Sequence, residues 1–344
     1  MKSVYLTAKQ LRRLNQQSSE GLRSLGQSYA KSILIDDHNI FIWTTAFAKA
    51  LDVDTKELLM DAIFSCYRDQ DIHVMSNQEN FDHTGLTEFL LEIVRRLGIP
   101  PQRVKISTTN ANYSGPFSHT YKDSSTFVAA GQYLPAAANP CDTSAKFIGT
   151  AIGRFSVSRL RLTYAMDLTF PGDTVIVFQD LQTGLEQLNR TGAVYDREIA
   201  WARGRQFDQD LSPEDYAREY WIAGCRSYYT WSAGFQIDVV AESNVFDCNF
   251  VTEKIAKPLA TGKPFVLLGA RHSLAALRER GFVTFGDFID ESYDEESVPY
   301  LRIRKMMKSL QKLYHSPQRQ QILGDMVAQA QYNIGHYTHL CRGL

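Results

Sequence analysis

The chain has 344 residues, more than twice the length of about 150 residues that is typical of one domain, so we expect two domains. Apolar residues make up 44% and charged residues 22%, close to the average for globular proteins, which excludes a disordered or collagen-like chain. The 37 Lys and Arg residues balance 38 Asp and Glu residues, and the net charge of −1 provides no overall attraction to nucleic acid or to an anionic membrane.

The cysteines and the N-terminal residues bear on the cellular compartment. The five cysteines are widely spaced and form no Cys-x-x-Cys pair, which argues against a zinc knot and against a secreted disulfide framework. The first residues lack the apolar stretch of a signal peptide, and no apolar run of about 18 residues is present for a membrane span. We therefore expect a cytoplasmic protein without a membrane span.

The first part of the chain alternates short apolar runs with helical patterns. Residues 1–30 are polar and fit either a short amphipathic helix or an ordered arm. The expected strands are 32–35, 72–75 and 104–107, and the expected helices are 41–51, 55–67 and 84–97. This alternation predicts an open, mainly parallel α/β sheet.

The second part of the chain repeats the alternation after a loop-rich segment. Residues 109–145 are rich in small and turn-forming residues, and we expect them to connect two domains. The strands expected beyond them are 147–152, 174–178, 236–241 and 264–269. The expected helices are 157–168, 213–223, 252–261, 273–280, 297–315 and 317–332. The sequence therefore predicts two consecutive α/β sheets.

The stretch 236–269 is one strand–loop–helix–strand unit with a charged helix start. Its first strand ends at Glu242, and Thr252 is placed to cap a helix that begins with Glu253 and Lys254. Ligands of open α/β sheets bind beyond the carboxyl ends of the strands, where the free N–H groups of helix N-termini favour a diphosphate. Lys254 would add a positive charge, and Glu253 would accept hydrogen bonds from ribose hydroxyls. An ordinary cap beside a solvated lysine is the alternative.

A second junction of strand and helix is basic. Strand 147–152 is followed by Gly153 and Arg154, and the next helix carries Arg159 and Arg161 near its start. The guanidinium group can bind phosphate oxygens in a bidentate manner. Arg161 would otherwise lie on a solvated helix face. Two junctions that each present a cation favour one shared anion site.

These motifs resemble the donor-binding signature of fucosyltransferase-type glycosyltransferases, which use nucleotide sugars and have the GT-B fold. The matching elements are Glu242-Ser243-Asn244, Phe250-Val251-Thr252-Glu253-Lys254, Ala260-Thr261-Gly262-Lys263-Pro264 and the upstream Arg159. Ser243-Asn244 reverses the order found in the family, and the loop before Glu253 is slightly longer. Residues 277–294 also resemble a continuation found in uncharacterised phage-type relatives, which would place the protein in a host cytoplasm if it is viral.

The resemblance implies a fold, a domain division and a donor site. The fold would be two Rossmann-like α/β domains that face each other across a cleft, with an acceptor-side domain over 1–140, a donor domain over 141–325 and a C-terminal helix over 326–344 that packs back on the first domain. Lys254 and Arg159 would hold the donor diphosphate, and Glu253 the ribose. The other expected donor-binding residues are Arg154, Glu242, Asn244 and Thr252. No metal ion or cofactor besides the nucleotide sugar is expected.

The catalytic base of such an enzyme would come from the first domain. Inversion at the sugar needs a carboxylate or imidazole that accepts the proton of the acceptor hydroxyl. Asp36 and Asp37 follow the first expected strand, and Glu79 follows the second, so these three are the candidates. A helix cap or a solvated turn is the alternative role of the two aspartates.

Three readings of the function stay open. The first is an inverting, metal-independent hexosyl- or pentosyltransferase with a glycan acceptor. The second is the same reaction on a hydroxylated DNA base, favoured by arginines 203, 205 and 218 and the aromatic-rich segment 220–235, which would contact phosphates and stack on bases. The third is a nucleotide- or glycan-binding protein of this fold without catalysis.

Overall fold

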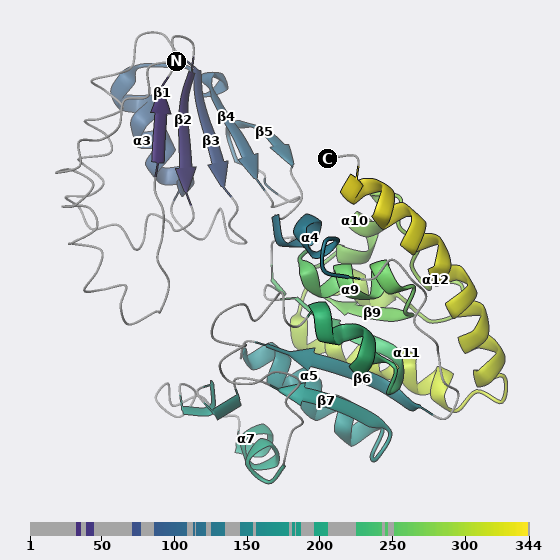
Figure 1. Ribbon diagram of the computed structural model, residues 1–344. Helices are drawn as coiled ribbons and strands as arrows, with labels where there is room; N and C mark the ends of the chain where they lie inside the picture. Colours follow the sequence, from purple (N-terminus) through teal and green to yellow (C-terminus); the bar gives the residue numbers. More distant parts are fainter. Residues whose placement is uncertain are drawn as a thin grey trace. The chain divides into compact units, whose positions relative to one another are not determined.

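The computed structural model of the chain divides into two compact units, Met1–Lys122 and Asp123–Leu344, which we describe one at a time (Figure 1). In the first unit it describes residues 32–35, 39–44, 71–76, 86–108, 113 and 115–121. In the second it describes 125–134, 145–153, 156–178, 181–182, 184–186, 196–205, 225–242, 245–246 and 251–342.

The N-terminal unit contains a five-stranded sheet in the order β1-β2-β3-β4-β5. The strands are β1 (Ser32–Ile35), β2 (Asn39–Thr44), β3 (Asp71–Ser76), β4 (Val104–Thr108) and β5 (Ser118–Tyr121). β1 and β2 are antiparallel, and every other neighbouring pair is parallel. The prediction of a mainly parallel α/β sheet is confirmed for this unit.

Helix α3 (Leu86–Leu97) has the predicted amphipathic pattern. Leu90, Ile93 and Val94 are buried, and Gly98 adopts a φ of 65°, the left-handed conformation that ends a helix. A 3-10 turn, η3 (Pro101–Arg103), leads into β4.

One prediction in this unit is wrong. Residues 41–44 were expected to begin a helix, but they belong to β2, whose sequence Ile-Phe-Ile-Trp-Thr over 40–44 is β-branched and aromatic throughout. Pairing with β1 and β3 on both sides stabilises the extended conformation. The remainder of the expected helix and the expected helix 55–67 lie outside the described residues.

The C-terminal unit contains a four-stranded parallel sheet in the order β7-β6-β8-β9. The strands are β6 (Lys146–Ile152), β7 (Thr174–Phe178), β8 (Phe235–Ala241) and β9 (Phe265–Leu268). Every residue of β8 is buried, as is usual for a strand covered on both faces. Gly149 of β6 allows this packing, because a Cβ atom there would lie 2.2 Å from the ring of Phe235.

The helices around this sheet form two groups (Figure 1). One group consists of α4 (Ser125–Ala130), α9 (Glu253–Thr261) and α12 (Arg319–Arg342), and in the other α5 (Val157–Thr169) packs on α11 (Pro299–Tyr314). The shorter elements are α7 (Asp196–Arg203), α10 (Ser273–Glu279) and η4 (Ser292–Glu295). Residues 225–232 are also helical, which the sequence did not predict, and the expected helix 213–223 lies outside the described residues.

The boundary between the units lies earlier than predicted. Residues 109–145 were expected to be a loop-rich connection between two domains, and the boundary after Lys122 falls within them. They also contain β5 and α4, and α4 belongs to the C-terminal unit. Phe127 of α4 packs edge-to-face against Phe282 and Tyr337, with ring centroids 6.2 and 5.2 Å apart. Helix α12 begins at residue 319 and packs against α9 and α4. That residues 326–344 pack back on the first domain stays a prediction.

Among the helices that the structure describes, none is long and apolar enough to cross a membrane.

Candidate functional site

The loop after β8 is closed by a buried carboxylate. Glu242 follows β8 directly, and its Oε1 accepts a hydrogen bond of 3.0 Å from the main-chain N–H of Thr252. Its Oε2 accepts a second one of 2.8 Å from the Thr252 hydroxyl. Both side chains are buried. Glu242 therefore fixes Thr252, the N-cap of α9, against the end of β8.

Thr252 caps α9 and holds Lys254. Its Oγ1 accepts hydrogen bonds from the main-chain N–H of Lys254 at 3.3 Å and from the Lys254 ammonium at 3.0 Å. The Lys254 ammonium also donates to Glu253 Oε1 at 2.9 Å and lies 3.8 Å from Glu242 Oε2. The side chain of Lys254 is 20% exposed, compared with 8% for Glu253 and 1% for Glu242, so Lys254 is the most exposed of the three charged residues.

The two carboxylates beside Lys254 are in different electrostatic environments. Burial raises the pKa of Glu242, and this effect outweighs the attraction of Lys254. Burial also acts to raise the pKa of Glu253, but the nearby Lys254 and Lys257 ammoniums lower the pKa to about 2. Glu253 is thus ionised at neutral pH and can accept hydrogen bonds.

Arg159 reaches the same strand end from a different helix. Ser156 caps α5 by accepting a hydrogen bond from the N–H of Arg159, and the Arg159 side chain is almost completely buried. Its Nη2 donates to the main-chain oxygen of Ala241 at 2.8 Å. Ala241 directly precedes Glu242 in the chain. Arg159 and Lys254, the cations of the two strand-to-helix junctions, therefore contact neighbouring residues at the carboxyl end of β8. Arg161 instead faces Glu198 and the ring of Tyr300.

A small hollow continues from Lys254 along β6 and β8, and sequence reasoning missed it. It has a volume of about 20 Å³, and Asp238, Tyr228, Trp231 and Lys257 are among its lining residues. The Tyr228 hydroxyl donates to Asp238 Oδ2 at 2.6 Å, and burial raises the pKa of Asp238 to about 6. The available signal was an aspartate inside the apolar strand Phe235–Ala241.

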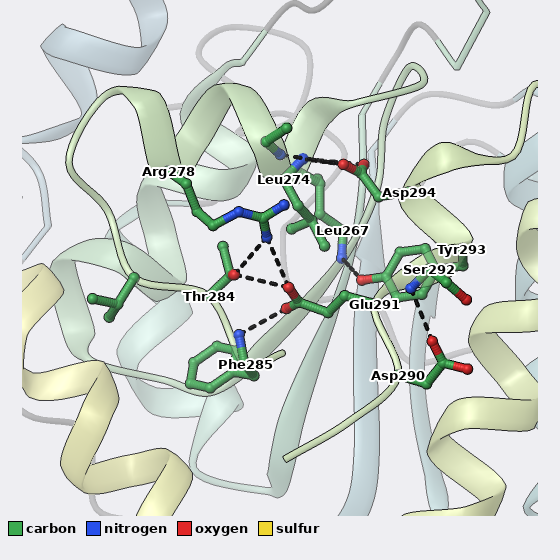
Figure 2. A network of polar contacts seen from close by, with 12 residues as sticks. Leu267, Leu274, Arg278, Thr284, Phe285, Asp290, Glu291, Ser292, Tyr293 and Asp294 are labelled. Atoms are coloured by element: carbon green, nitrogen blue, oxygen red, sulfur yellow. Dashed lines mark hydrogen bonds and ion pairs between the residues drawn. The ribbon is translucent and has the colours of Figure 1, made fainter. Parts of the chain in front are cut away.

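A larger cavity of about 650 Å³ lies beside α10. Figure 2 shows the polar contacts among its lining residues Arg278, Thr284 and Glu291. Glu291 accepts hydrogen bonds there from Arg278 at 2.9 Å, from the Thr284 hydroxyl at 2.8 Å and from the N–H of Phe285 at 2.7 Å. Asp294 accepts from the N–H groups of Leu274 and Ala275 at the start of α10. These polar groups hold the chain between α10 and η4 in place, which is a structural role for much of the stretch 277–294.

The structure brings five of the predicted site residues together and leaves the others undescribed. The residues that meet at the end of β8 are Arg159, Glu242, Thr252, Glu253 and Lys254. The predicted residues Asp36, Asp37, Glu79, Arg154 and Asn244 lie outside the described parts of the chain.

The aromatic segment expected to stack on DNA bases has a different role where it is described. Tyr228 is completely buried, and its hydroxyl bonds to Asp238. Trp231 packs between Tyr228 and Phe235, with ring centroids 5.6 and 4.7 Å away. Arg205 is bonded to Asp167. These aromatic residues form core contacts, so they do not provide an exposed stacking surface.

Comparison with known proteins does not assign the chain to a family: no family model matches it, and no curated protein matches its sequence. Within the described residues, no three His, Cys, Asp or Glu side chains are grouped so that they could hold a metal ion.

Proposed function

We propose that this protein is an inverting, metal-independent glycosyltransferase of GT-B-like architecture that uses a nucleotide-diphosphate sugar as donor. The observation that carries the proposal is the meeting of two cations from separate strand-to-helix junctions at one strand end. Arg159 Nη2 lies 2.8 Å from the oxygen of Ala241, and Lys254 Nζ lies 3.8 Å from Glu242 Oε2. The carboxyl end of a parallel sheet is where such folds bind nucleotides.

The proposed reaction needs positive charge at the leaving group. The acceptor oxygen forms a bond to the anomeric carbon as the bond from that carbon to the diphosphate oxygen breaks. The base removes the hydroxyl proton of the acceptor, and the nucleoside diphosphate leaves with the bonding electron pair. Lys254 stabilises the charge that develops on the diphosphate, which is the task of preorganised cations in such a site.

The surrounding residues divide into ligand-binding and positioning residues. Lys254 contacts the diphosphate. To do so, its ammonium gives up its contacts with the carboxylates of Glu253 and Glu242 and binds phosphate oxygens instead. Glu253 is ionised and accepts hydrogen bonds from the ribose. Arg159 is too buried for direct contact and acts through its charge, while Glu242 and Thr252 position the start of α9.

The acceptor side of the proposal concerns the N-terminal unit. We propose a hydroxyl acceptor on a glycan or on a modified nucleobase, with Asp36, Asp37 or Glu79 as the base. The second candidate function is nucleotide or glycan binding without catalysis. It keeps the cationic site but needs no base.

Titration calorimetry with a panel of nucleoside diphosphates tests the donor site. Replacing Lys254 by Ala should weaken the best ligand by about 30-fold or more, because a charge-assisted contact contributes about 2 kcal/mol. The exposed Lys308 on α11 is the matched control, and Lys308→Ala should bind like the wild type. If Lys254→Ala retains the wild-type affinity, the donor site is not at the start of α9.

Turnover separates the enzyme from the binding protein. Incubation with the matching nucleotide sugar should release free nucleoside diphosphate, slowly with water and faster with an acceptor. Tight donor binding with no release under either condition would favour the non-catalytic alternative.

A further inference from the structure

Two residues that line the hollow beside Lys254 carry hydrogen-bond donors without a hydrogen-bond partner among the described residues. The indole N–H of Trp231 is buried and has no hydrogen-bond partner among the described residues. The half-buried Lys257 ammonium lies 5.9 Å from the centre of the Tyr228 ring, and it forms no hydrogen bond or ion pair with any residue that the structure describes. A buried Trp N–H usually finds a partner, so an orphaned one next to an ammonium indicates that a ligand supplies the acceptor.

The other polar groups of the hollow already have partners. Asp238 accepts from the Tyr228 hydroxyl, and the Thr150 hydroxyl donates to the main-chain oxygen of Val239 at 2.6 Å. Lys254, which also lines the hollow, adds a second ammonium. A ligand in the hollow would therefore find hydrogen-bond donors, two of them cationic, and few acceptors without a partner. A ligand that accepts hydrogen bonds and carries negative charge fits these groups best.

The size of the hollow limits how much of an anion can enter. Its volume of about 20 Å³ accommodates one water-sized group, since about 10–15 Å³ is needed for one. A complete phosphate group does not fit, but one of its oxygens does. The remainder of the group would lie at the mouth, beside Lys254.

We propose that this hollow is a phosphate subsite in which Lys257 and the indole N–H of Trp231 bind one oxygen of a phosphoryl group held by Lys254. The inference rests on the proposed donor site and extends it by two residues outside the recognised motifs. Free inorganic phosphate has the same chemistry as the donor's diphosphate, so both are used as probes.

Asp238 makes this binding depend on pH. Its carboxylate lines the hollow, and the groups that act on it are Tyr228 from the helical stretch 225–232 together with Lys257 and Lys263. Burial raises its pKa to about 6, so it is largely neutral at pH 5 and charged at pH 8. An ionised carboxylate repels an anion, and phosphate affinity should therefore fall as the pH rises through 6.

The test is calorimetric titration of the full chain with inorganic phosphate, pyrophosphate and the best nucleoside diphosphate. The variants are Trp231→Phe, which keeps the packing and removes the N–H, and Lys257→Met, which keeps the stem and removes the charge. Each should weaken all three probes by about tenfold or more, as expected for the loss of one hydrogen bond to a charged group. Lys308→Gln on the exposed face of α11 is the control and should change nothing. Unchanged melting temperatures of the variants would confirm that they are folded.

Two results would overturn the inference. If all three probes bind Trp231→Phe and Lys257→Met as tightly as wild type while Lys254→Ala loses them, the hollow is not a subsite, although the proposed donor site stands. If neither phosphate, pyrophosphate nor any nucleoside diphosphate binds the wild type, the donor site and the subsite both fail. A weakening confined to inorganic phosphate would assign the hollow to the free anion and not to the donor.

Discussion

Three buried carboxylates, Asp238 within β8, Glu242 directly after it and Glu253 at the start of α9, have pKa values that move in different directions. Burial raises the pKa of Asp238 and of Glu242, whereas Lys254 and Lys257 lower that of Glu253 to about 2 despite its burial. The pKa of Glu253 is lowered because its carboxylate is in direct contact with a cation, accepting a hydrogen bond of 2.9 Å from the Lys254 ammonium. Shifted pKa values are common at functional sites, because the buried and charged groups that bind a ligand also act on neighbouring titratable side chains.

Asp238 should make the stability of the protein depend on pH. Its pKa rises from 3.8 in the unfolded chain to about 6 in the folded one, so folding favours the protonated carboxyl. The stabilisation is complete below pH 3.8 and is lost as the pH rises through 6. The loss amounts to about 3 kcal/mol at 1.36 kcal/mol per pH unit.

Urea unfolding of the wild type and of Asp238→Asn, measured between pH 4.5 and 7.5, tests this. The free energy of unfolding of the wild type should decrease more steeply across this range than that of the variant. The Tyr228→Phe variant is the companion control, because it removes the hydroxyl but keeps the carboxylate titration. Parallel curves for the wild type and Asp238→Asn would show that this carboxyl does not titrate near pH 6.

At the scale of elements, the start of α9 is fixed by more than an ordinary helix cap. The Thr252 hydroxyl caps the helix, donates to Glu242 and accepts from the Lys254 ammonium. Ser156 of α5 is a simpler case, since its side chain accepts the N–H of Arg159 in the common capping manner. The two caps therefore allow a direct comparison.

Thr252→Ala should lower the free energy of unfolding by about 2–3 kcal/mol, because it removes a cap worth about 1 kcal/mol and a hydrogen bond to a buried carboxylate. Ser156→Ala should cost only about 1 kcal/mol. Thr252→Ser keeps the hydroxyl and should stay close to the wild type. Urea unfolding at pH 7 measures all three. Equal costs for the two alanine variants would mean that the bond to Glu242 contributes nothing.

The sequence predicted the regular elements well where local signals agree. β7 was placed with its exact bounds and β8 within one residue, because turn residues flank apolar runs of strand length. β2 was missed because residues 41–51 were assigned to a helix, although the i, i+2 spacing of Phe41 and Trp43 is typical of a strand. Pairing with β1 and β3 fixes the extended conformation. The helical stretch 225–232 was missed because its aromatic residues were interpreted as a surface for stacking.

The candidate site was only partly predictable, for a physical reason. Motif residues that follow one strand are close in sequence, so Glu242, Thr252 and Lys254 could be grouped in advance. Asp238, Trp231 and Lys257 come from a strand, a neighbouring helix and the second turn of α9, and only packing brings them to one hollow. No local pattern indicates that the Trp231 N–H would lack a partner.

At the scale of the whole molecule, the boundary between the two units, after Lys122, falls inside the segment 109–145 that composition marks as a linker. Small and turn-forming residues at 109–145 predicted a connection, yet α4 inside this segment belongs to the core of the second unit. Phe127 and Ala130 of α4 are completely buried there. Composition indicates the local backbone preference of a segment. The boundary between two units depends instead on which unit's core the side chains of that segment pack against.

The position of this boundary predicts how fragments behave. A fragment over 123–344 should fold cooperatively, and one over 141–344 should be less stable, because it exposes the surface that Phe127 covers on Phe282 and Tyr337.

Phe127→Ala in the longer fragment should lower the free energy of unfolding by about 3–5 kcal/mol, the usual cost of replacing a buried aromatic side chain by alanine. Leu168→Ala is the control, since Leu168 is 61% exposed and should cost within about 0.5 kcal/mol. Thermal and urea unfolding would measure each difference. Equal stability of the two fragments would place the boundary near residue 140, and α4 would then be an appendage of the second unit and not part of its core.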